Sequence, residues 1–505
     1  MKRTAADVYF ENNKAHDDHA GRSLRGGAVS VAARGVNAFV QIGSVLFLAR
    51  LLSPEDYGLV AMVTALTGFA PILIDLGTRD AIVQRARVSR GEVSALFWTT
   101  IAIGTVFTTL TALCGPVIAR FYGEPRLTAI VLASSFTFLA CALSVQHYSL
   151  MRRHLMFQEL AVIDVISNLL SAVVAVTAGL LGAGYWALIV RPIATPTFLA
   201  VGVWIRCRWL PGKPEFTDGV KDSVKFGVNI TGFCLTDFAS RSTDRVAIGY
   251  RTGASGLGQY QNAMFVYDNL LDVLVYPLHG VAVASLSKLR DDLGELRRAW
   301  GKALSLVAFF AMPAFGLLAS TSQDVVVVLL GQKWASAGLL LSVLAFRGIP
   351  HCVERTMGWL HVTAGRSDRW VKWGLFAAAV QVVGVLCGLP FGPFGIAVAY
   401  VVTMFLLFVP AVAYAGRPLD IYAGDVVRIV WRPMLASVAA AAIAFATRWT
   451  MLPDMHPFWR GVVLGIVYLT AYLALVVGVL NERTPVRTTR TLVRGYFTAR
   501  VAQLP

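Results

Sequence analysis

Charged residues are scarce in this chain of 505 residues: Asp, Glu, Lys and Arg make up 15% of it, against about 25% in ordinary soluble domains. Hydrophobic residues reach 56%, and the mean hydropathy is +0.63. Glycine (44) and proline (20) are spread along the whole length, which excludes collagen, coiled coil and low-complexity sequence. The composition therefore indicates an all-α membrane protein that crosses the bilayer many times, with no room for a separate soluble domain.

Cysteine is also scarce, and its spacing excludes two kinds of site. The six cysteines lie in or beside apolar stretches, with no CxxC pair and no histidine at ligand spacing, so the sequence predicts neither a metal site nor a disulfide framework. The basic segments contain no GxxxxGK[ST] sequence for binding ATP. We therefore expect no cofactor, and any energy input must come from an ion gradient or from the imbalance of the substrate itself.

Apolar stretches long enough to cross a bilayer of about 30 Å occur fourteen times. The first is too long and too polar for a secretory signal, and no small-residue cleavage site follows it. We therefore expect the N-terminal tail to stay attached. The predicted spans are 27–48, 57–77, 93–119, 126–147, 159–181, 184–205, 219–240, 260–283, 302–320, 335–361, 369–390, 393–415, 429–449 and 459–480.

The 45 Lys and Arg residues predict the orientation, because cationic loops remain on the cytoplasmic side of the membrane. With the N-terminus inside, 32 of the 45 lie in the two tails and the cytoplasmic loops, 9 lie on the other side and 4 lie within spans. Both termini are therefore predicted to be cytoplasmic. The net charge of +16 is explained by topology and by attraction to anionic lipid headgroups, and we expect no nucleic-acid partner.

Four of the predicted spans carry polar faces that lipid would not tolerate, because an ionised side chain at the bilayer centre costs about 2.5–3.5 kcal/mol. In the first span the polar residues recur every three or four positions and form one stripe. The seventh and tenth spans share a charge spacing of i, i+4, i+7 and i+8, and the eighth has two aspartates one turn apart. The residues are Ser30, Arg34, Asn37, Gln41 and Ser44; Asp237, Arg241, Asp244 and Arg245; Arg347, His351, Glu354 and Arg355; and Asp268 and Asp272.

Two interpretations of these faces stay open. Each residue could belong to a structural ion pair, such as Asp237 with Arg241. Alternatively, the faces surround one hydrated cavity that prefers an anion, because arginine outnumbers acid there and guanidinium binds phosphate oxygens bidentately. The second interpretation predicts a diphosphate-bearing lipid as substrate. Its predicted ligands are Arg34, Asn37, Gln41, Arg191, Arg241, Arg245, Arg347 and Arg355, and the carboxylates that could bind a coupling H⁺ or Na⁺ are Asp237, Asp268, Asp272 and Glu354.

A weak internal repeat predicts two lobes. Arg50 is followed by LLSPEDYGLVAM and Arg251 by TGASGLGQYQNAM, and the glycines of the two strings, Gly58 and Gly258, are 200 positions apart. Parallel repeats of this kind place a transporter's substrate site between the halves. We expect a tail at 1–26, an N-lobe at 27–210, a C-lobe at 211–416, two further helices at 417–480 and a tail at 481–505.

Several motifs resemble those of the Wzx-type oligosaccharide flippases of the MOP (multidrug, oligosaccharidyl-lipid, polysaccharide) superfamily, most closely the colanic-acid exporter branch. The resemblance covers residues 24–480 and is found in LARLLSPEDYGLVAMV, DLG followed by IVQR, DRVAIG, LGQYQNA, Tyr276-Pro277 and GQKW. The motif residues are Arg50, Pro54, Tyr57, Gly58, Asp75, Gly77, Asp244, Gly258, Tyr260, Pro277 and Trp334. Considered singly, Pro54 and Gly58 are typical of a turn and a helix start, and Tyr57 and Trp334 are typical of interfacial anchors.

The resemblance implies two six-helix lobes in a V around a central cavity, with two more helices beside them. It also implies a bacterial inner-membrane protein that turns oligosaccharide linked through diphosphate to undecaprenol from the cytoplasmic to the periplasmic leaflet, for exopolysaccharide or lipopolysaccharide biosynthesis. Polysaccharide polymerase and glycosyltransferases are the partners that this role suggests.

Two other functions were weighed against a flippase. A multidrug or other lipid exporter of the same superfamily would need an apolar or acidic pocket for cationic drugs, which the excess of intramembrane arginine disfavours. A polymerase or ligase would need a large periplasmic loop with acid and base groups. The longest predicted external connections, near 241–259 and 321–334, contain no carboxylate pair and no histidine, so the sequence does not predict an enzyme.

Overall fold

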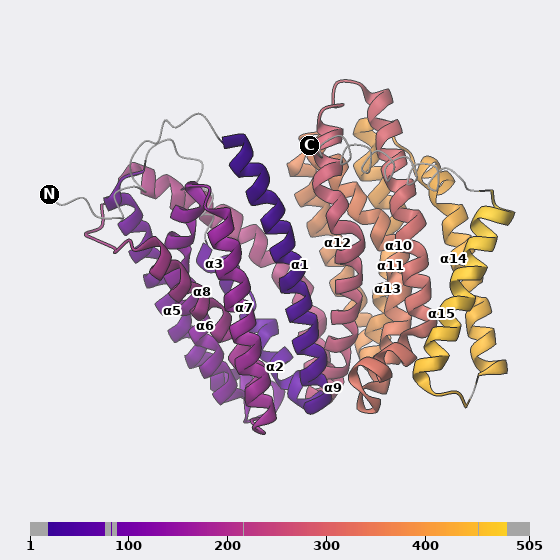
Figure 1. Cartoon of the computed structure of the whole chain (residues 1–505), viewed down its shortest axis with the longest axis horizontal. Coiled ribbons are helices and arrows are strands. Elements are labelled where there is room, and N and C mark those ends of the chain that lie inside the picture. Colours follow the sequence, from indigo (N-terminus) through magenta and orange to yellow (C-terminus); the bar gives the residue numbers. More distant parts are fainter. Residues whose placement is uncertain (1–18, 76–81, 83–87, 216, 453, 482–505) are drawn as a thin grey trace, which may run out of the picture. The chain divides into compact units, whose positions relative to one another are not determined.

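The computed structural model describes residues 19–75, 82, 88–215, 217–452 and 454–481, and every regular element in this part of the chain is helical (Figure 1). Short 3₁₀ turns lie at Gln332–Trp334, Leu389–Phe391 and Arg417–Leu419, and a π turn at Ala474–Val479. The α-helices are α1 (His19–Leu51), α2 (Pro54–Thr67), the short α3 (Ala70–Asp75), α5 (Arg90–Tyr122), α6 (Leu127–Arg153), α7 (Phe157–Leu180), α8 (Trp186–Cys207), α9 (Asp218–Ser287), α10 (Leu293–Leu330), α11 (Ala335–Thr363), α12 (Ser367–Gly388), α13 (Gly392–Gly416), α14 (Ala423–Met451) and α15 (Pro457–Leu473).

Eleven stretches of the described residues are helical, long and apolar enough to cross a membrane, and one of them, 368–419, contains both α12 and α13. The prediction of an all-α membrane protein with many spans is confirmed. Each of the fourteen predicted spans overlaps a helix, and two of them lie on α9, which is interrupted at Gly253. The count of fourteen is compatible with this arrangement and stays a prediction.

The two segments expected to be long connections, 241–259 and 321–334, are mostly helical, and their external position stays a prediction. Charged residues lower the hydropathy of 241–251, but helical backbone hydrogen bonds do not depend on apolar side chains, so α9 continues through them. The chain breaks instead at Gly253, with φ 70°, a backbone conformation that glycine adopts without strain. Likewise, α10 extends to Leu330 and ends at Gly331, with φ 101°.

The chain divides into two compact units, Met1–Gly258 and Gln259–Pro505. In the first unit α5 packs on α6, α6 on α8, and α7 on both α8 and α1. In the second unit α10 packs on α11, α14 and α15, and α13 packs on α11 and α12. The first unit includes α9 as far as Gly258, beyond the expected N-lobe end at 210, and the expected lobe boundaries stay a prediction.

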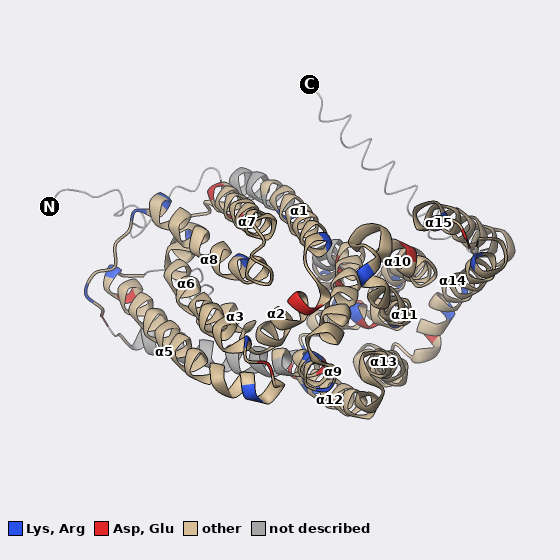
Figure 2. Cartoon of the chain, turned by 90° about the horizontal axis from the view of Figure 1, so that it is seen from below, with Lys and Arg blue, Asp and Glu red and all other residues tan. Residues whose placement is uncertain are grey.

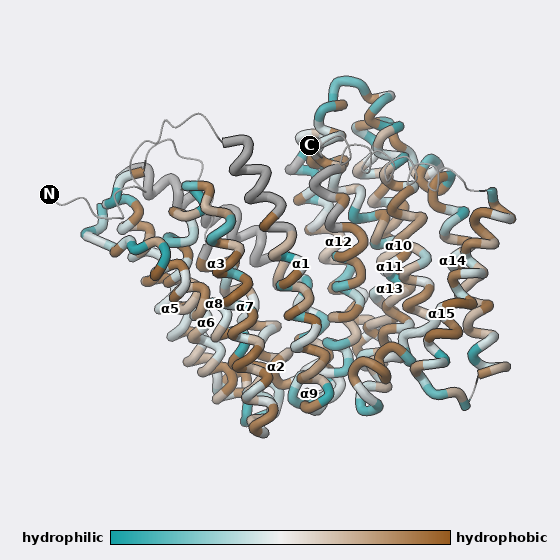
Figure 3. The backbone as a smooth tube through the Cα atoms, in the orientation of Figure 1, coloured by the Kyte–Doolittle hydropathy of each residue, from teal (hydrophilic) through white to brown (hydrophobic). Residues whose placement is uncertain are grey.

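The surfaces of these helices suit a hydrocarbon environment. Large apolar side chains such as Leu113, Phe376 and Leu406 are more than half exposed in mid-helix. Charged residues are sparse along most helices (Figure 2), and hydrophilic positions gather mainly near helix ends and connections (Figure 3). In water such apolar exposure would oppose folding, whereas in a bilayer it contacts lipid.

Within the first unit, the two stretches of the internal repeat pack against one another. A Cβ added to Gly58 would lie 1.7 Å from the carbonyl oxygen of Ala254, and one added to Gly258 would lie 1.8 Å from that of Pro54. The offset of 200 residues that relates Gly58 to Gly258 also relates Pro54 to Ala254. The two contacts are therefore equivalent by the repeat, and α2 crosses α9 backbone to backbone at glycine.

In the second unit α14 and α15 are tied to α10 by polar contacts. Asp324, 1% exposed, pairs with Arg448 at 2.7 Å and with Arg460 at 2.7 Å. Further along, the hydroxyl of Tyr468 and that of Ser437 lie 2.8 Å apart, and Ser437 donates to the carbonyl of Met312. These contacts, together with an apolar cluster shared by α14 and α15, make the last two long helices part of the second unit.

Candidate functional site

In the first unit, α8 directs Arg191 toward the polar stripe of α1. Its guanidinium donates to the hydroxyl of Ser44 at 2.6 Å and to the amide oxygen of Asn168 on α7 at 2.9 Å. Asn168 in turn donates to the amide oxygen of Asn37 at 3.1 Å. No described carboxylate forms an ion pair with Arg191, so a membrane helix holds a cation among neutral hydrogen-bond acceptors.

The stripe predicted on α1 has two kinds of members. Asn37 and Ser44 face α7 and α8 through the contacts with Asn168 and Arg191, whereas Arg34 and Gln41 are exposed. The side chain of Ser30 lies outside the described residues. One edge of the stripe is therefore used for packing within the first unit, and the other edge is exposed on that unit.

The charged residues predicted on the seventh span lie on α9. Asp244 is buried, 2% exposed, and accepts the backbone N–H of Arg245 at 2.7 Å. The Nε of Arg245 is buried and has no hydrogen-bond partner among the described residues. Arg241 is exposed, and the side chain of Asp237 lies outside the described residues, as does any pairing of it with Arg241.

In the second unit, Arg347 on α11 is buried, 9% exposed. Its Cζ lies 4.7 Å from the ring centroid of Tyr400 on α13 and 5.5 Å from that of Tyr267 on α9. Its Nε has no hydrogen-bond partner, and no carboxylate of the described residues forms an ion pair with it. Cation–π contacts of this kind contribute about 0.5–2 kcal/mol, and they leave the N–H donors of the guanidinium free of charged acceptors.

His351 lies one turn beyond Arg347. Its Nδ1 is 2.8 Å from the hydroxyl of Tyr267, and its Nε2 is 3.9 Å from Glu354. Asp268 is half-buried next to Tyr267 on α9, and Asp272 is exposed. Arg355 is exposed, and the His351 ring is one neighbour of the Glu354 carboxylate.

The predicted site residues are thus divided between the two units. Each unit gathers part of its own set around one arginine, Arg191 in the first and Arg347 in the second. That all of the predicted ligands surround a single cavity stays a prediction. The first unit holds Arg34, Asn37, Gln41, Arg191, Asp237, Arg241 and Arg245, and the second holds Asp268, Asp272, Arg347, Glu354 and Arg355.

The motif residues have mainly packing roles in the structure. The hydroxyl of Tyr57 donates to the carbonyl of Val45 at 3.0 Å. Tyr57 and Trp334 are buried, so the interpretation of both as interfacial anchors is wrong. Arg50 is exposed and Tyr260 fully buried. Gly77 and the side chains of Asp75 and Pro277 lie outside the described residues.

Sequence reasoning missed several residues that complete these arrangements. Asn168 lies four residues after Asp164 in a helix that is otherwise mostly apolar, and this spacing of two polar residues on one helix face was an available signal. Tyr267 and Tyr400 carry no signal, because a tyrosine in a membrane helix is indistinguishable from a packing residue until its neighbours are known. No group of three or more His, Cys, Asp or Glu side chains suited to a metal occurs in the described part of the chain.

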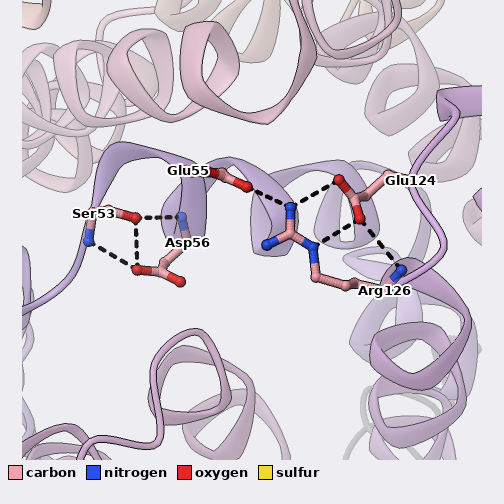
Figure 4. Close-up of polar contacts among 5 residues, drawn as sticks. All are labelled: Ser53, Glu55, Asp56, Glu124 and Arg126. Carbon is pink, nitrogen blue, oxygen red and sulfur yellow. Dashed lines mark hydrogen bonds and ion pairs between the residues drawn. The ribbon is translucent and has the colours of Figure 1, made fainter.

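The start of α2 and the α5–α6 connection are joined by a polar network (Figure 4). Ser53 caps α2 by accepting the N–H of Asp56, whose carboxylate accepts the N–H of Ser53 at 2.9 Å. Arg126 pairs with Glu55 and with Glu124. Hydrogen bonding from Arg126 lowers the pKa of Glu124 below its ordinary value. This network holds the helix start next to the crossing at Gly58.

The sequence comparisons match proteins named for polysaccharide or cell-envelope polymer biosynthesis. A family model described as Polysaccharide biosynthesis protein matches residues 47–338. Over 418 residues the chain is 22% identical to the lipopolysaccharide biosynthesis protein WzxC of Escherichia coli (strain K12), covering 79% of this chain and 82% of that protein. Over 337 residues it is 25% identical to the teichuronic acid biosynthesis protein TuaB of Bacillus subtilis (strain 168), covering 66% and 70%.

Among solved structures, the lipid II flippase MurJ in an inward closed conformation has a TM-score of 0.69 to this chain, with 16% sequence identity. The match covers 91% of this chain and 100% of that one. An inward-facing multidrug resistance transporter of the MATE family, in the MOP superfamily, has a TM-score of 0.51 with 13% identity, covering 77% and 99%. At these identities the likeness establishes a shared fold.

Proposed function

Because the chain belongs to the family described as Polysaccharide biosynthesis protein, we propose that it is a lipid-linked oligosaccharide flippase. Its substrate is a polysaccharide repeat unit joined through diphosphate to undecaprenol, which it moves from the cytoplasmic to the periplasmic leaflet by alternating access. The family match, the relative WzxC and the fold shared with MurJ support this proposal. They agree with the Wzx-type motifs of the sequence.

The observation that carries the proposal is the state of two arginines in membrane helices. Arg191 has only neutral hydrogen-bond partners, and Arg347 lies over tyrosine rings without an ion-pair partner among the described residues. A buried cation without a counter-charge is costly, and a bound anion would relieve that cost. Guanidinium matches the oxygens of a diphosphate, which is the charged group of the proposed substrate.

Export of cationic drugs is the alternative within the same fold. It would require an apolar or acidic pocket, and the cationic side chains of Arg191 and Arg347 disfavour it. Enzymatic activity is not part of the proposal, since WzxC and MurJ are named as a biosynthesis protein and a flippase and the residues argued here bind rather than react. Partner polymerases and glycosyltransferases are expected only as neighbours in the pathway.

The proposed location is the bacterial inner membrane, with both termini cytoplasmic. The distribution of Lys and Arg supports this orientation. Loading would then occur on the side where the basic loops lie, which also attract anionic headgroups.

Reconstituted vesicles provide the direct test. Purified protein in proteoliposomes should move undecaprenyl-diphosphate-linked oligosaccharide across the bilayer, measured as loss of accessibility to an added glycosidase. Empty vesicles and a cationic dye substrate are the controls. Flipping no faster than in empty vesicles would refute the proposal, and dye export without flipping would favour the multidrug alternative.

The arginine ligands can be tested in the same assay. Arg34→Ala, Arg241→Ala and Arg347→Ala should each reduce flipping at least tenfold, and the Lys variants should recover only part of it, because lysine lacks the planar fork of donors. Arg206→Ala is the matched control, since Arg206 is exposed at a helix end and pairs with Glu159. Wild-type rates in all three Ala variants would remove the cationic site.

Coupling to H⁺ or Na⁺ is proposed at one of Asp237, Asp268, Asp272 and Glu354, where ion binding would alternate with substrate binding. An imposed gradient should then accelerate flipping in wild-type vesicles, and the Asn or Gln variant of the coupling residue should lose this acceleration. A rate that is indifferent to both gradients and to all four variants would indicate a facilitator driven by removal of product.

A further inference from the structure

Arg347 is the most deeply buried of the predicted ligands whose side chains are described, at 9% exposed. Its Nε–H has no acceptor among the described residues, and a buried donor without an acceptor costs free energy that a ligand oxygen can recover. Asp268 is near enough to attract the guanidinium electrostatically, but no ion pair joins Arg347 to a carboxylate among the described residues. The side chain is therefore held in place by something other than a salt bridge.

Two aromatic rings supply that support. Tyr400 on α13 and Tyr267 on α9 lie 4.7 Å and 5.5 Å from the Cζ of Arg347, measured to the ring centroids. The five N–H donors of a guanidinium lie in its own plane, so ring contacts can restrain the group without occupying its donors. A restrained arginine loses less conformational entropy when an anion binds to it.

Tyr267 is itself restrained. Its hydroxyl lies 2.8 Å from Nδ1 of His351 on α11, and its ring packs against Phe315 on α10, with centroids 5.3 Å apart. His351 is one helical turn from Arg347, so the hydrogen bond connects the helix that carries the arginine with the helix that carries the ring. The orientation of Tyr267 thus depends on α11 as well as on α9.

We propose that Tyr267, Tyr400 and, through Tyr267, His351 are positioning residues that present the guanidinium of Arg347 to the diphosphate of the substrate. The inference rests on the proposed function, in which Arg347 is a diphosphate ligand. The tyrosines stabilise the arginine in its binding geometry through their ring faces. His351 contributes only by fixing the ring of Tyr267, so its effect requires the tyrosine hydroxyl.

A double-mutant cycle on anion affinity tests this. Binding of inorganic pyrophosphate to the detergent-solubilised full chain is measured by calorimetry for wild type, Tyr267→Phe, His351→Ala, Tyr400→Leu, Arg347→Ala and their combinations. Tyr267→Phe and His351→Ala should each weaken binding about fivefold, as expected for one lost hydrogen bond, and the pair should weaken it no further. Tyr400→Leu should weaken it about threefold to thirtyfold.

The matched control is Tyr468→Phe. Tyr468 is also fully buried in the second unit and bonded to a side chain, Ser437 at 2.8 Å, but it does not contact Arg347. Its variant should bind pyrophosphate as wild type does. Thermal unfolding of every variant identifies losses of affinity that arise from misfolding, and Tyr267→Phe, which keeps the ring, should unfold near the wild-type temperature.

The outcomes separate this inference from the function. Additive effects of Tyr267→Phe and His351→Ala, further losses on top of Arg347→Ala, or no pyrophosphate binding by wild type would overturn it. The protein could instead bind pyrophosphate through Arg347, with non-additive effects of Tyr267→Phe and His351→Ala, yet flip no lipid-linked oligosaccharide. That result would refute the proposed function and leave the positioning roles standing. If the protein flips the substrate but its pyrophosphate affinity does not change in the Tyr267, His351 and Tyr400 variants, the positioning roles are refuted and the proposed function stands.

Discussion

At the scale of single residues, arginines of this chain meet three different environments. Arg191 donates to neutral oxygens, Arg347 lies over tyrosine rings, and Arg448 pairs with the buried Asp324. Among the described residues, the first two have no ion-pair partner that would make them purely structural. This difference, rather than the presence of arginine in a membrane helix, distinguishes a candidate ligand from a structural ion pair.

The exposed pair of Arg126 and Glu124 gives a prediction for pH. Because Arg126 lowers the pKa of Glu124 in the folded state, the pair stabilises the fold above the ordinary glutamate pKa and loses this effect as the pH falls through the lowered value. Arg126→Gln should therefore lower stability at pH 7 by less than about 1 kcal/mol, as is usual for exposed pairs. Thermal unfolding in detergent should show this difference disappear in acid. A difference that grows below pH 4 would contradict it.

At the scale of elements, the crossing of α2 and α9 depends on glycine. Gly58→Ala would place a methyl group 1.7 Å from the carbonyl oxygen of Ala254, and backbone cannot move aside as a flexible side chain can. We expect a loss of about 1–3 kcal/mol, as in overpacked cores. The thermal unfolding midpoint in detergent measures it.

Gly43→Ala on α1 is the control for that variant, because nothing lies within 4 Å of the added methyl group. It should leave stability unchanged or raise it by up to about 1 kcal/mol, since alanine favours helix over glycine. Equal losses of stability in Gly58→Ala and Gly43→Ala would show that the close helix crossing does not explain why glycine is needed at position 58.

The attachment of α14 and α15 to α10 gives a second prediction at this scale. Asp324→Ala removes the carboxylate shared by Arg448 and Arg460 and should cost about 3–5 kcal/mol, as for other broken buried pairs. Asp420→Asn is the control, because its pair with Arg297 is exposed and should cost less than about 1 kcal/mol, and asparagine tolerates the left-handed backbone of Asp420, with φ 49°. Limited proteolysis near 452–456 should increase only in the first variant. Similar behaviour of the two variants would exclude a special role for Asp324.

At the scale of the whole molecule, the distribution of cations predicts that both termini are cytoplasmic. In a variant without the six native cysteines, Ala15→Cys and Gly495→Cys should not react with a membrane-impermeant thiol reagent in intact cells. Pro125→Cys, in the connection between α5 and α6, should react. Labelling at position 15 or 495 before the cells are broken would refute the topology.

The elements themselves were determined by the sequence. Long apolar stretches specify helices because a backbone in hydrocarbon must satisfy its hydrogen bonds internally, and turns at Gly253 and Gly331 follow from their conformational freedom. The helical structure of 321–334 and 241–259 was missed because hydropathy measures side chains, whereas a helix is held by backbone hydrogen bonds. The family motifs could likewise be recognised from the sequence alone.

Only the tertiary structure decided which groups meet. Helical spacing placed Asn37 and Ser44 on one stripe, but not Asn168 and Arg191 against it. Spacing along α11 places His351 and Glu354 three residues apart on one face, but it could not reveal the two tyrosines beside Arg347. The spacing of residues along one helix determines the direction in which each side chain points around the axis of that helix. Which residue of another helix it meets depends on how segments distant in sequence pack together. That packing determines whether a buried arginine is neutralised or remains able to bind an anion.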